Sequence, residues 1–327
     1  MKLEEIKKET ELEGGRLIYL SYGGSILHGT NHENSDLDMI GIFIPNIKDI
    51  VLKRDKKYID LSTSDKEVKN DKNDIDIKIV SIYEFFSKLK INNLTALELL
   101  FSMNSKSVIY ETEISKKIFK NKELFLTSNL DSIIGNVTKN VKKLENKNER
   151  YKSLRKFLDF IEEKTKDFSP IDFKKKSISE LEGIENYHYD KNIYISNDQL
   201  IIIDKKYGLN NRSGFLIKGV EKILSKYRIK TEDIDYSDYK ILVHTYSSLL
   251  LSEELYKTGE IKYPLKDRDL LKDIKFGKFT PTEINEKISS MISTIQKMKK
   301  EEQSVLPDKN LDQKEKIDSL LFDLVVF

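Results

Sequence analysis

Three apolar runs in the first hundred residues predict three buried strands. The run at 16–22 stops at two glycines, the run at 36–44 is followed by Pro45 and Asn46, and the run at 74–80 alternates polar with apolar positions. Short apolar runs that end at glycine or proline are typical of strands inside a protein. The segment between the second and third runs, 53–73, is mostly charged and is expected to be an exposed excursion.

Helical patterns follow two of these runs. Residues 25–31 have room for one or two turns, and Ser81 with Glu84 makes a capping box that opens a helix over 81–89. A second helix is expected over 94–101. The order strand, short helix, strand, strand, helix predicts a compact α+β domain, and its sheet cannot be wholly parallel because strands two and three are able to pair directly.

The remainder of the chain reads as mostly helical. Apolar residues recur at helical spacing between about 111 and 170, and a small β-hairpin is predicted near 193–203. Further helices are predicted over 214–226, 239–258 and 280–298, and the apolar C-terminal segment 320–327 is expected to pack against the body of the protein. We therefore predict two domains, residues 1–115 and 116–327.

Composition narrows the functional classes. The chain has 327 residues, a formal net charge of +2 and no cysteine, so disulfides, thiolate nucleophiles and Cys-ligated zinc are excluded. We see neither a signal peptide nor a membrane-spanning segment, which favours a cytoplasmic protein. Basic runs at 174–176 and 297–300 are read first as solvated helix faces, although a local nucleic-acid surface stays open.

The richest chemistry lies at the edges of the predicted strands. Asp36 and Asp38 are two residues apart on the second strand and therefore project from one face, and Asp76 on the third strand joins them if the two strands pair. Three converging carboxylates repel one another unless a cation neutralises them, so Mg²⁺ or Mn²⁺ is the expected cofactor. Two such ions would suit an in-line phosphoryl displacement.

The turn after the first strand supplies a complementary feature. Gly24 lets the backbone approach a phosphate closely, and Ser25 offers its hydroxyl and the following amide groups to triphosphate oxygens. Thr30 and Ser35 are expected to hold this loop through local side-chain hydrogen bonds.

Together these motifs resemble the DNA polymerase β-type nucleotidyltransferase superfamily. Gly-Ser followed by Ser-Asp-x-Asp and a later acidic strand is similar, more narrowly, to the predicted nucleotidyltransferases of bacteria and phages. The resemblance covers residues 16–102 well and recurs more faintly over 240–277. It implies a polymerase-β-like catalytic domain with Asp36, Asp38 and Asp76 as catalytic metal ligands and Gly24 and Ser25 at the triphosphate.

The implied activity is transfer of a nucleoside monophosphate from an NTP to an acceptor hydroxyl, with release of pyrophosphate. RNA, for instance tRNA, is the first choice of acceptor, and a protein hydroxyl is close behind. A second nucleotide, giving a signalling oligonucleotide, and a small molecule are further options. The alternative that is not an enzyme is an inactive interaction protein that binds a nucleotide. The oligomeric state stays open.

Five other polar side chains are weaker candidates. Lys240 and His244 stand one helical turn apart, which fits contact with nucleotide or acceptor and fits equally a hydrogen-bonding role at the surface or between domains. His28 and His32 lie inside the loop, where a bystander role is the more common one. Arg212, before the helix at 214, fits either a phosphate clamp or an exposed loop residue. Three tyrosines, Tyr187, Tyr189 and Tyr194, would suit base stacking but more often serve packing.

Overall fold

The structure is a computed structural model that describes residues 2–33, 35–62, 75–165, 176–227, 236–301, 303–308 and 311–326. The chain forms two compact units. Unit 1 combines residues 1–138 with 240–327, and unit 2 comprises residues 139–239. Part of the predicted basic run at 174–176 and Asp74 lie outside the described residues.

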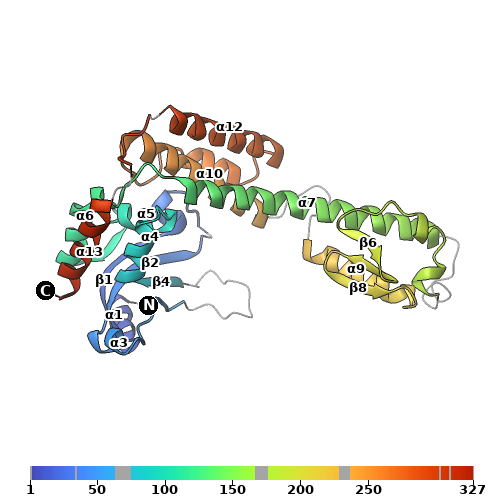
Figure 1. The fold of residues 1–327 in the computed structure, drawn as a ribbon, viewed down its shortest axis with the longest axis horizontal. Helices are drawn as coiled ribbons and strands as arrows, with labels where there is room; N and C mark the ends of the chain where they lie inside the picture. The colour runs from blue at the N-terminus through green and yellow to red at the C-terminus, as the bar shows by residue number, and fades with distance from the viewer. Residues whose placement is uncertain are drawn as a thin grey trace. The chain divides into compact units, whose positions relative to one another are not determined.

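Unit 1 is built on a mixed five-stranded sheet with the order β3-β4-β2-β1-β5 (Figure 1). Its strands are β1 (Gly15–Tyr22), β2 (Leu37–Pro45), β3 (Tyr58–Asp60), β4 (Ile75–Ser81) and β5 (Val108–Glu111). Strands β2 and β4 pair in parallel, whereas β1 with β2, β1 with β5 and β3 with β4 are antiparallel. The predicted α+β class and the mixed sheet are confirmed.

The first helices of the chain surround this sheet. They are α1 (Leu3–Leu12), α2 (Gly24–His28), α3 (Ile47–Val51), α4 (Ile82–Leu89), α5 (Leu94–Ser102), α6 (Glu113–Lys120) and the 3₁₀ turn η1 (Lys122–Phe125). The predicted start of α4 is confirmed, because the hydroxyl of Ser81 accepts the amide N–H of Glu84. That bond satisfies one of the free donors at the helix N-terminus.

The exposed excursion expected at 53–73 is confirmed for residues 53–58, which are exposed, but it did not include a strand. Strand β3 lies in this segment and pairs with β4, and Ile59 is buried against the sheet. Its pattern of a single apolar residue between Tyr58 and Asp60 is too short to show periodicity. Strand β5 was also not predicted, because its four residues, three half-buried and one exposed, carry no strong alternation.

Apolar residues from both faces of the sheet form the core of unit 1. One cluster joins Ile6 of α1 to residues of β1, β2, β3 and β4, namely Leu17, Leu20, Met39, Phe43, Ile59, Ile77 and Ile79. Helix α4 buries Phe85 and Phe86, and Phe86 meets Phe125 edge to face with ring centroids 5.0 Å apart. The sheet is therefore fixed rigidly where its strands end.

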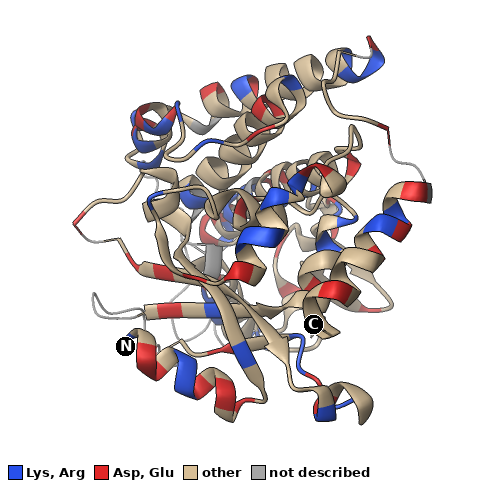
Figure 2. Cartoon of the chain, turned by 90° about the vertical axis from the view of Figure 1, so that its left-hand side faces the viewer, with Lys and Arg blue, Asp and Glu red and all other residues tan. Residues whose placement is uncertain are grey.

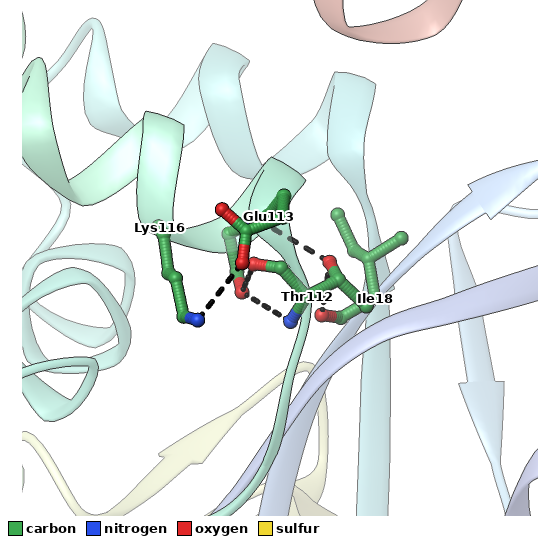
Figure 3. Close-up of polar contacts among 5 residues, drawn as sticks. Ile18, Thr112, Glu113 and Lys116 are labelled. Atoms are coloured by element: carbon green, nitrogen blue, oxygen red, sulfur yellow. Dashed lines mark hydrogen bonds and ion pairs between the residues drawn. The ribbon is translucent and has the colours of Figure 1, made fainter.

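The edge strand β5 is tied to its neighbour through the start of α6 (Figure 3). Thr112 donates its hydroxyl to the carbonyl oxygen of Ile18 at 2.9 Å, and Lys116 pairs with Glu113 on the first turn. These contacts join the start of α6, and with it the edge strand β5, to β1.

The C-terminal part of unit 1 consists of α10 (Tyr236–Thr258), α11 (Arg268–Lys275), α12 (Pro281–Lys300) and α13 (Leu311–Val326). The carbonyl of His28 accepts the amide N–H of Leu265 at 3.1 Å, so the segment before α11 is bonded to α2. In α13, Ile317, Leu320 and Leu324 are buried. These contacts explain why 240–327 belongs with the first unit, although we predicted a division at residue 115.

Unit 2 contains most of helix α7 (Asp131–Thr165), the long green helix of Figure 1, and a small sheet. The predicted hairpin is present as β6 (Ile193–Ser196) and β7 (Gln199–Ile202), and β8 (Lys205–Gly208) adds a third strand. Helix α9 (Ser213–Tyr227) and the turns η2 (Ile178–Glu180) and η3 (Ile184–Asn186) complete it. Its core joins Phe157 of α7 to Leu200 of β7 and Leu216 of α9.

Charged residues of both signs alternate along the helices at the surface (Figure 2). Among the residues that the structure describes, no helix is both long enough and apolar enough to cross a membrane.

Replacing Phe86 with alanine should lower the free energy of unfolding by about 3–5 kcal/mol, because a buried ring leaves a cavity that the sheet cannot fill. Phe322→Ala, at a position that is 60% exposed, is the matched control and should change stability by less than about 0.5 kcal/mol. Urea unfolding followed by circular dichroism measures both. Equal effects of the two substitutions would contradict this description of the core.

Candidate active site

The turn after β1 lies directly on the carboxylate of Asp38. The amide N–H of Gly23 donates to the backbone carbonyl of Asp38 at 2.9 Å. Gly24 has a φ of +51°, and a Cβ there would overlap Oδ2 of Asp38. Only glycine meets both conditions, so the sequence Gly23-Gly24 sets the approach of the loop to the acidic strand.

The parallel pairing of β2 and β4 places Asp38 and Asp76 at directly opposing positions in the register. Asp36 lies immediately before β2, two residues from Asp38. Burial raises the pKa of Asp38, and the charges of Asp76 and Asp36 raise it further, while Lys240 opposes them. Asp38 and Asp76 are thus neighbours in the sheet, and Asp36 lies near enough to raise the pKa of Asp38. The catalytic and metal-binding roles of the three aspartates stay a prediction.

Two lysines from the C-terminal part of unit 1 act on this acidic group. Lys240 of α10 lowers the pKa of Asp38, which brings one predicted side chain to the site. Lys275, the last residue of α11, has a lowered pKa because it is half-buried and because Lys240 lies near, although Asp36 and Asp38 oppose the shift. The site therefore combines three carboxylates with two ammonium groups.

Local hydrogen bonds hold the loop between α2 and β2. The amide N–H of Thr30 donates to the carbonyl of Ser25 at 2.8 Å, and the hydroxyl of Ser35 accepts the amide N–H of His32 at 2.9 Å. The side-chain role predicted for Ser35 is present. Thr30 is buried and is bonded through its backbone.

His28 connects the loop to neighbouring elements of unit 1. Its Nε2 lies 2.6 Å from Oε1 of Glu98 on α5, and its ring stacks on Tyr263 with centroids 5.9 Å apart. The loop and the segment before α11 approach closely at Gly29, where a Cβ would come within 2.7 Å of Pro264. His28 thus serves as a structural link between α2, α5 and the C-terminal segment.

His32 lies beside Phe276 at the end of α11, with ring centroids 5.4 Å apart. Desolvation lowers its pKa, and the positive charge of Lys275 lowers it further. The ring contact with Phe276 joins the loop to the end of α11, the helix that carries Lys275.

Three further candidates have the following surroundings within their own units. His244 is exposed, and in the described part of the chain its ring makes no hydrogen bond. Arg212 is exposed in unit 2. Tyr187 contacts Phe157 and Tyr189 in the core of unit 2, which is the packing role.

The residue types at this edge fit a divalent cation. The carboxylates of Asp36, Asp38 and Asp76 offer oxygen donors alone, and their mutual repulsion is expressed in the raised pKa of Asp38. Within the described residues, no three His, Cys, Asp or Glu side chains are already gathered tightly enough to hold a metal ion. A bound cation would have to draw these side chains together.

The sequence pattern did not identify Lys275. It stands in the short motif Ile274-Lys-Phe-Gly277, far along the chain from the aspartates, and an isolated lysine carries no periodic signal. The repeated family resemblance over 240–277 was the available indication. The docking of α11 on the loop is what makes this lysine part of the site.

Comparison with known proteins agrees with this geometry. Residues 1–175 match the model of a family described as RNA repair pathway DNA polymerase beta family, RlaP. The chain is also 26% identical over 298 residues to a protein of Enterobacteria phage T4, described as an uncharacterized 38.9 kDa protein in the nrdC-mobD intergenic region. That similarity covers 86% of this chain and 89% of the phage protein. No solved structure matches the chain.

The raised pKa of Asp38 predicts that Asp38→Asn raises the melting temperature at pH 7 by a few degrees in buffer with EDTA. A carboxyl whose pKa is raised in the folded state destabilises that state once pH exceeds its ordinary value near 3.8. The advantage of the asparagine should therefore vanish as pH falls below that value.

Asp323→Asn, at an exposed position of α13, is the control and should show no such dependence on pH. Differential scanning calorimetry between acidic and neutral pH measures both variants. A melting temperature of Asp38→Asn at or below that of the wild type at pH 7 would contradict the crowding of charge at this edge.

Proposed function

The chain belongs to the RNA repair pathway DNA polymerase beta family, and from this premise we propose that it transfers a nucleoside monophosphate from an NTP to a hydroxyl of an RNA acceptor. The observation that carries the proposal is the opposition of Asp38 and Asp76 in adjacent parallel strands, with Gly24 lying on the carboxylate of Asp38. The description of the family as an RNA repair family supports RNA as the acceptor.

The triphosphate would lie between the loop and the lysines. Gly24 lets the backbone approach its oxygens, and Ser25 offers a hydroxyl donor. Lys240 and Lys275, which already lie close enough to influence Asp38 and Asp36, would contact the β- and γ-phosphates as point charges.

The acceptor hydroxyl then attacks the α-phosphorus in line with the leaving group. A new oxygen–phosphorus bond forms, the bond from the α-phosphorus to the bridging oxygen breaks, and pyrophosphate leaves. The proton of the hydroxyl passes to a carboxylate, for which Asp76 is positioned beside Asp38, or to solvent. Mg²⁺ or Mn²⁺ held by Asp36, Asp38 and Asp76, two ions in the full arrangement, would supply charge neutralisation of the triphosphate and the leaving pyrophosphate.

The first test follows radiolabel from each α-labelled NTP into RNA in the presence of Mg²⁺. Asp36→Ala/Asp38→Ala should reduce transfer on the order of 10³-fold, because charge stabilisation at such a site contributes several kcal/mol. Glu9→Ala/Glu11→Ala on α1, exposed and equally spaced, should leave the rate unchanged. Undiminished transfer by the double Asp variant would overturn the mechanism, and label in protein or in a short oligonucleotide would replace RNA as the acceptor.

The second test concerns Lys275. Lys275→Ala should raise the KM for NTP about tenfold or more, because a charge-assisted contact to phosphate contributes roughly 1.5–3 kcal/mol, with a smaller effect on kcat. Lys278→Ala removes an equal charge three residues away, where the lysine pairs with Asp273, and should leave the KM unchanged. Steady-state kinetics at saturating RNA measures both. An unchanged KM in Lys275→Ala would remove this residue from the triphosphate site.

A further inference from the structure

One face of helix α7 carries an unusual excess of positive charge. Residues 139–156 contain eight Lys or Arg and two Glu, whereas the entire chain has a net charge of only +2. At about 100° per residue, five of these cations fall within a single arc of about 140°. They are Lys139, Lys142, Lys143, Lys147 and Arg150, which we call the basic face.

The basic face contains no acidic and no apolar residue. Asn136 and Asn146 are the other large polar residues within this arc, while Glu149 lies about 20° and Glu145 about 60° beyond its edge. Glu149 is engaged by Lys191 at 2.5 Å. Lys139, Lys142 and Lys143 are exposed, and in the described part of the chain none of these three forms an ion pair.

Elsewhere the chain uses the same helical spacing to pair opposite charges. Such pairs, three or four residues apart, are Glu4 with Lys7, Glu113 with Lys116, Arg155 with Asp159, Glu253 with Lys257 and Asp312 with Lys316. On the basic face, Lys139 and Lys143 instead place like charges four residues apart. Such a pair destabilises an isolated helix, and a bound polyanion would relieve this repulsion.

The basic face does not serve the packing of unit 2. The residues of α7 that enter the core of that unit are Leu154, Phe157, Leu158 and Ile161. They begin after the last residue of the basic face, Arg150. Between 139 and 150 the buried apolar residue is Leu144, which points away from the cations. The packing of unit 2 therefore does not account for the positive charge of Lys139, Lys142 and Lys143.

We propose that the basic face of α7 binds the phosphate backbone of the RNA acceptor. The inference rests on the proposed transfer to RNA and adds the surface that holds this substrate. Residues 139–150 span about 16 Å along the helix, and successive phosphates of a stacked strand lie about 3.4 Å apart along its axis. The face thus matches about five phosphates of one strand. These contacts carry no base specificity, so they bind and orient RNA of any sequence.

Binding is tested with the whole chain in the absence of nucleotide. The probe is a labelled oligouridine of about 20 nucleotides, which is longer than the basic face requires, and the readout is fluorescence anisotropy. Lys139→Gln/Lys142→Gln/Lys143→Gln should reduce the slope of log Kd against log salt concentration by about 2, since each lost phosphate contact contributes about 0.7 for a single strand. Near 0.1 M salt the Kd should rise on the order of 10- to 100-fold.

The matched control is Lys152→Gln/Arg155→Gln/Lys156→Gln, which removes the same charge from the same helix outside the basic face. It should keep most of the affinity and the slope, and circular dichroism should show equal helix content in both triple variants. Equal losses in the two variants, or no loss in the first, would overturn the proposal. Tighter binding of a DNA oligonucleotide of matching sequence than of the RNA would overturn RNA as the partner.

The readout is independent of the transfer reaction. Asp36→Ala/Asp38→Ala should bind the oligouridine as tightly as the wild type. Normal transfer to RNA by the basic-face variant, with unchanged affinity, would reject the basic face and leave the proposed function standing. If the wild type shows no transfer but the salt slopes are as predicted, the proposed function would be rejected and the basic face would stand.

Discussion

The burial of Asp38 beside Asp76 is the constraint on which the candidate site depends. Burial raises the pKa of Asp38, and the parallel pairing of β2 with β4 sets Asp76 opposite it, where a second negative charge raises that pKa further. A fold selected for stability alone would separate them. The surrounding structure holds them together instead, through Gly24 on one side and through Lys240 and Lys275 on the other. Such stored electrostatic strain is a common property of functional sites.

The C-terminal helices of unit 1 contribute side chains to the candidate site. The loop after β1 is bonded to the segment before α11 through His28 and Leu265, and it contacts the end of α11 through His32 and Phe276. Glu98 beneath His28 ties the same loop to α5. Because these contacts fix α11 against the loop, Lys275 reaches the carboxylates with part of its side chain buried. The site is thus assembled from segments at both ends of the chain.

The sequence predicted the elements whose signals are local and left out those that depend on distant contacts. Strands β1, β2 and β4 are long apolar runs with glycine, proline or a capping box at their ends, and Asp36, Asp38 and Asp76 follow directly from their positions on them. Strand β3 was not predicted, because Ile59 is buried only through its pairing with β4. Lys275 and the structural role of His28 could not be predicted either, since both follow from the docking of α11 and α5 on the loop.

Binding of Mn²⁺ in the presence of a non-hydrolysable NTP is the most direct test of the central claim that the acidic edge and the loop form one nucleotide site. Electron paramagnetic resonance reports the free Mn²⁺ and hence the bound fraction. We expect the wild type to bind Mn²⁺ together with the NTP, and Asp76→Asn to lose most of that binding while keeping its fold. Equal Mn²⁺ binding by the wild type and by Asp76→Asn, or none by the wild type, would contradict the account.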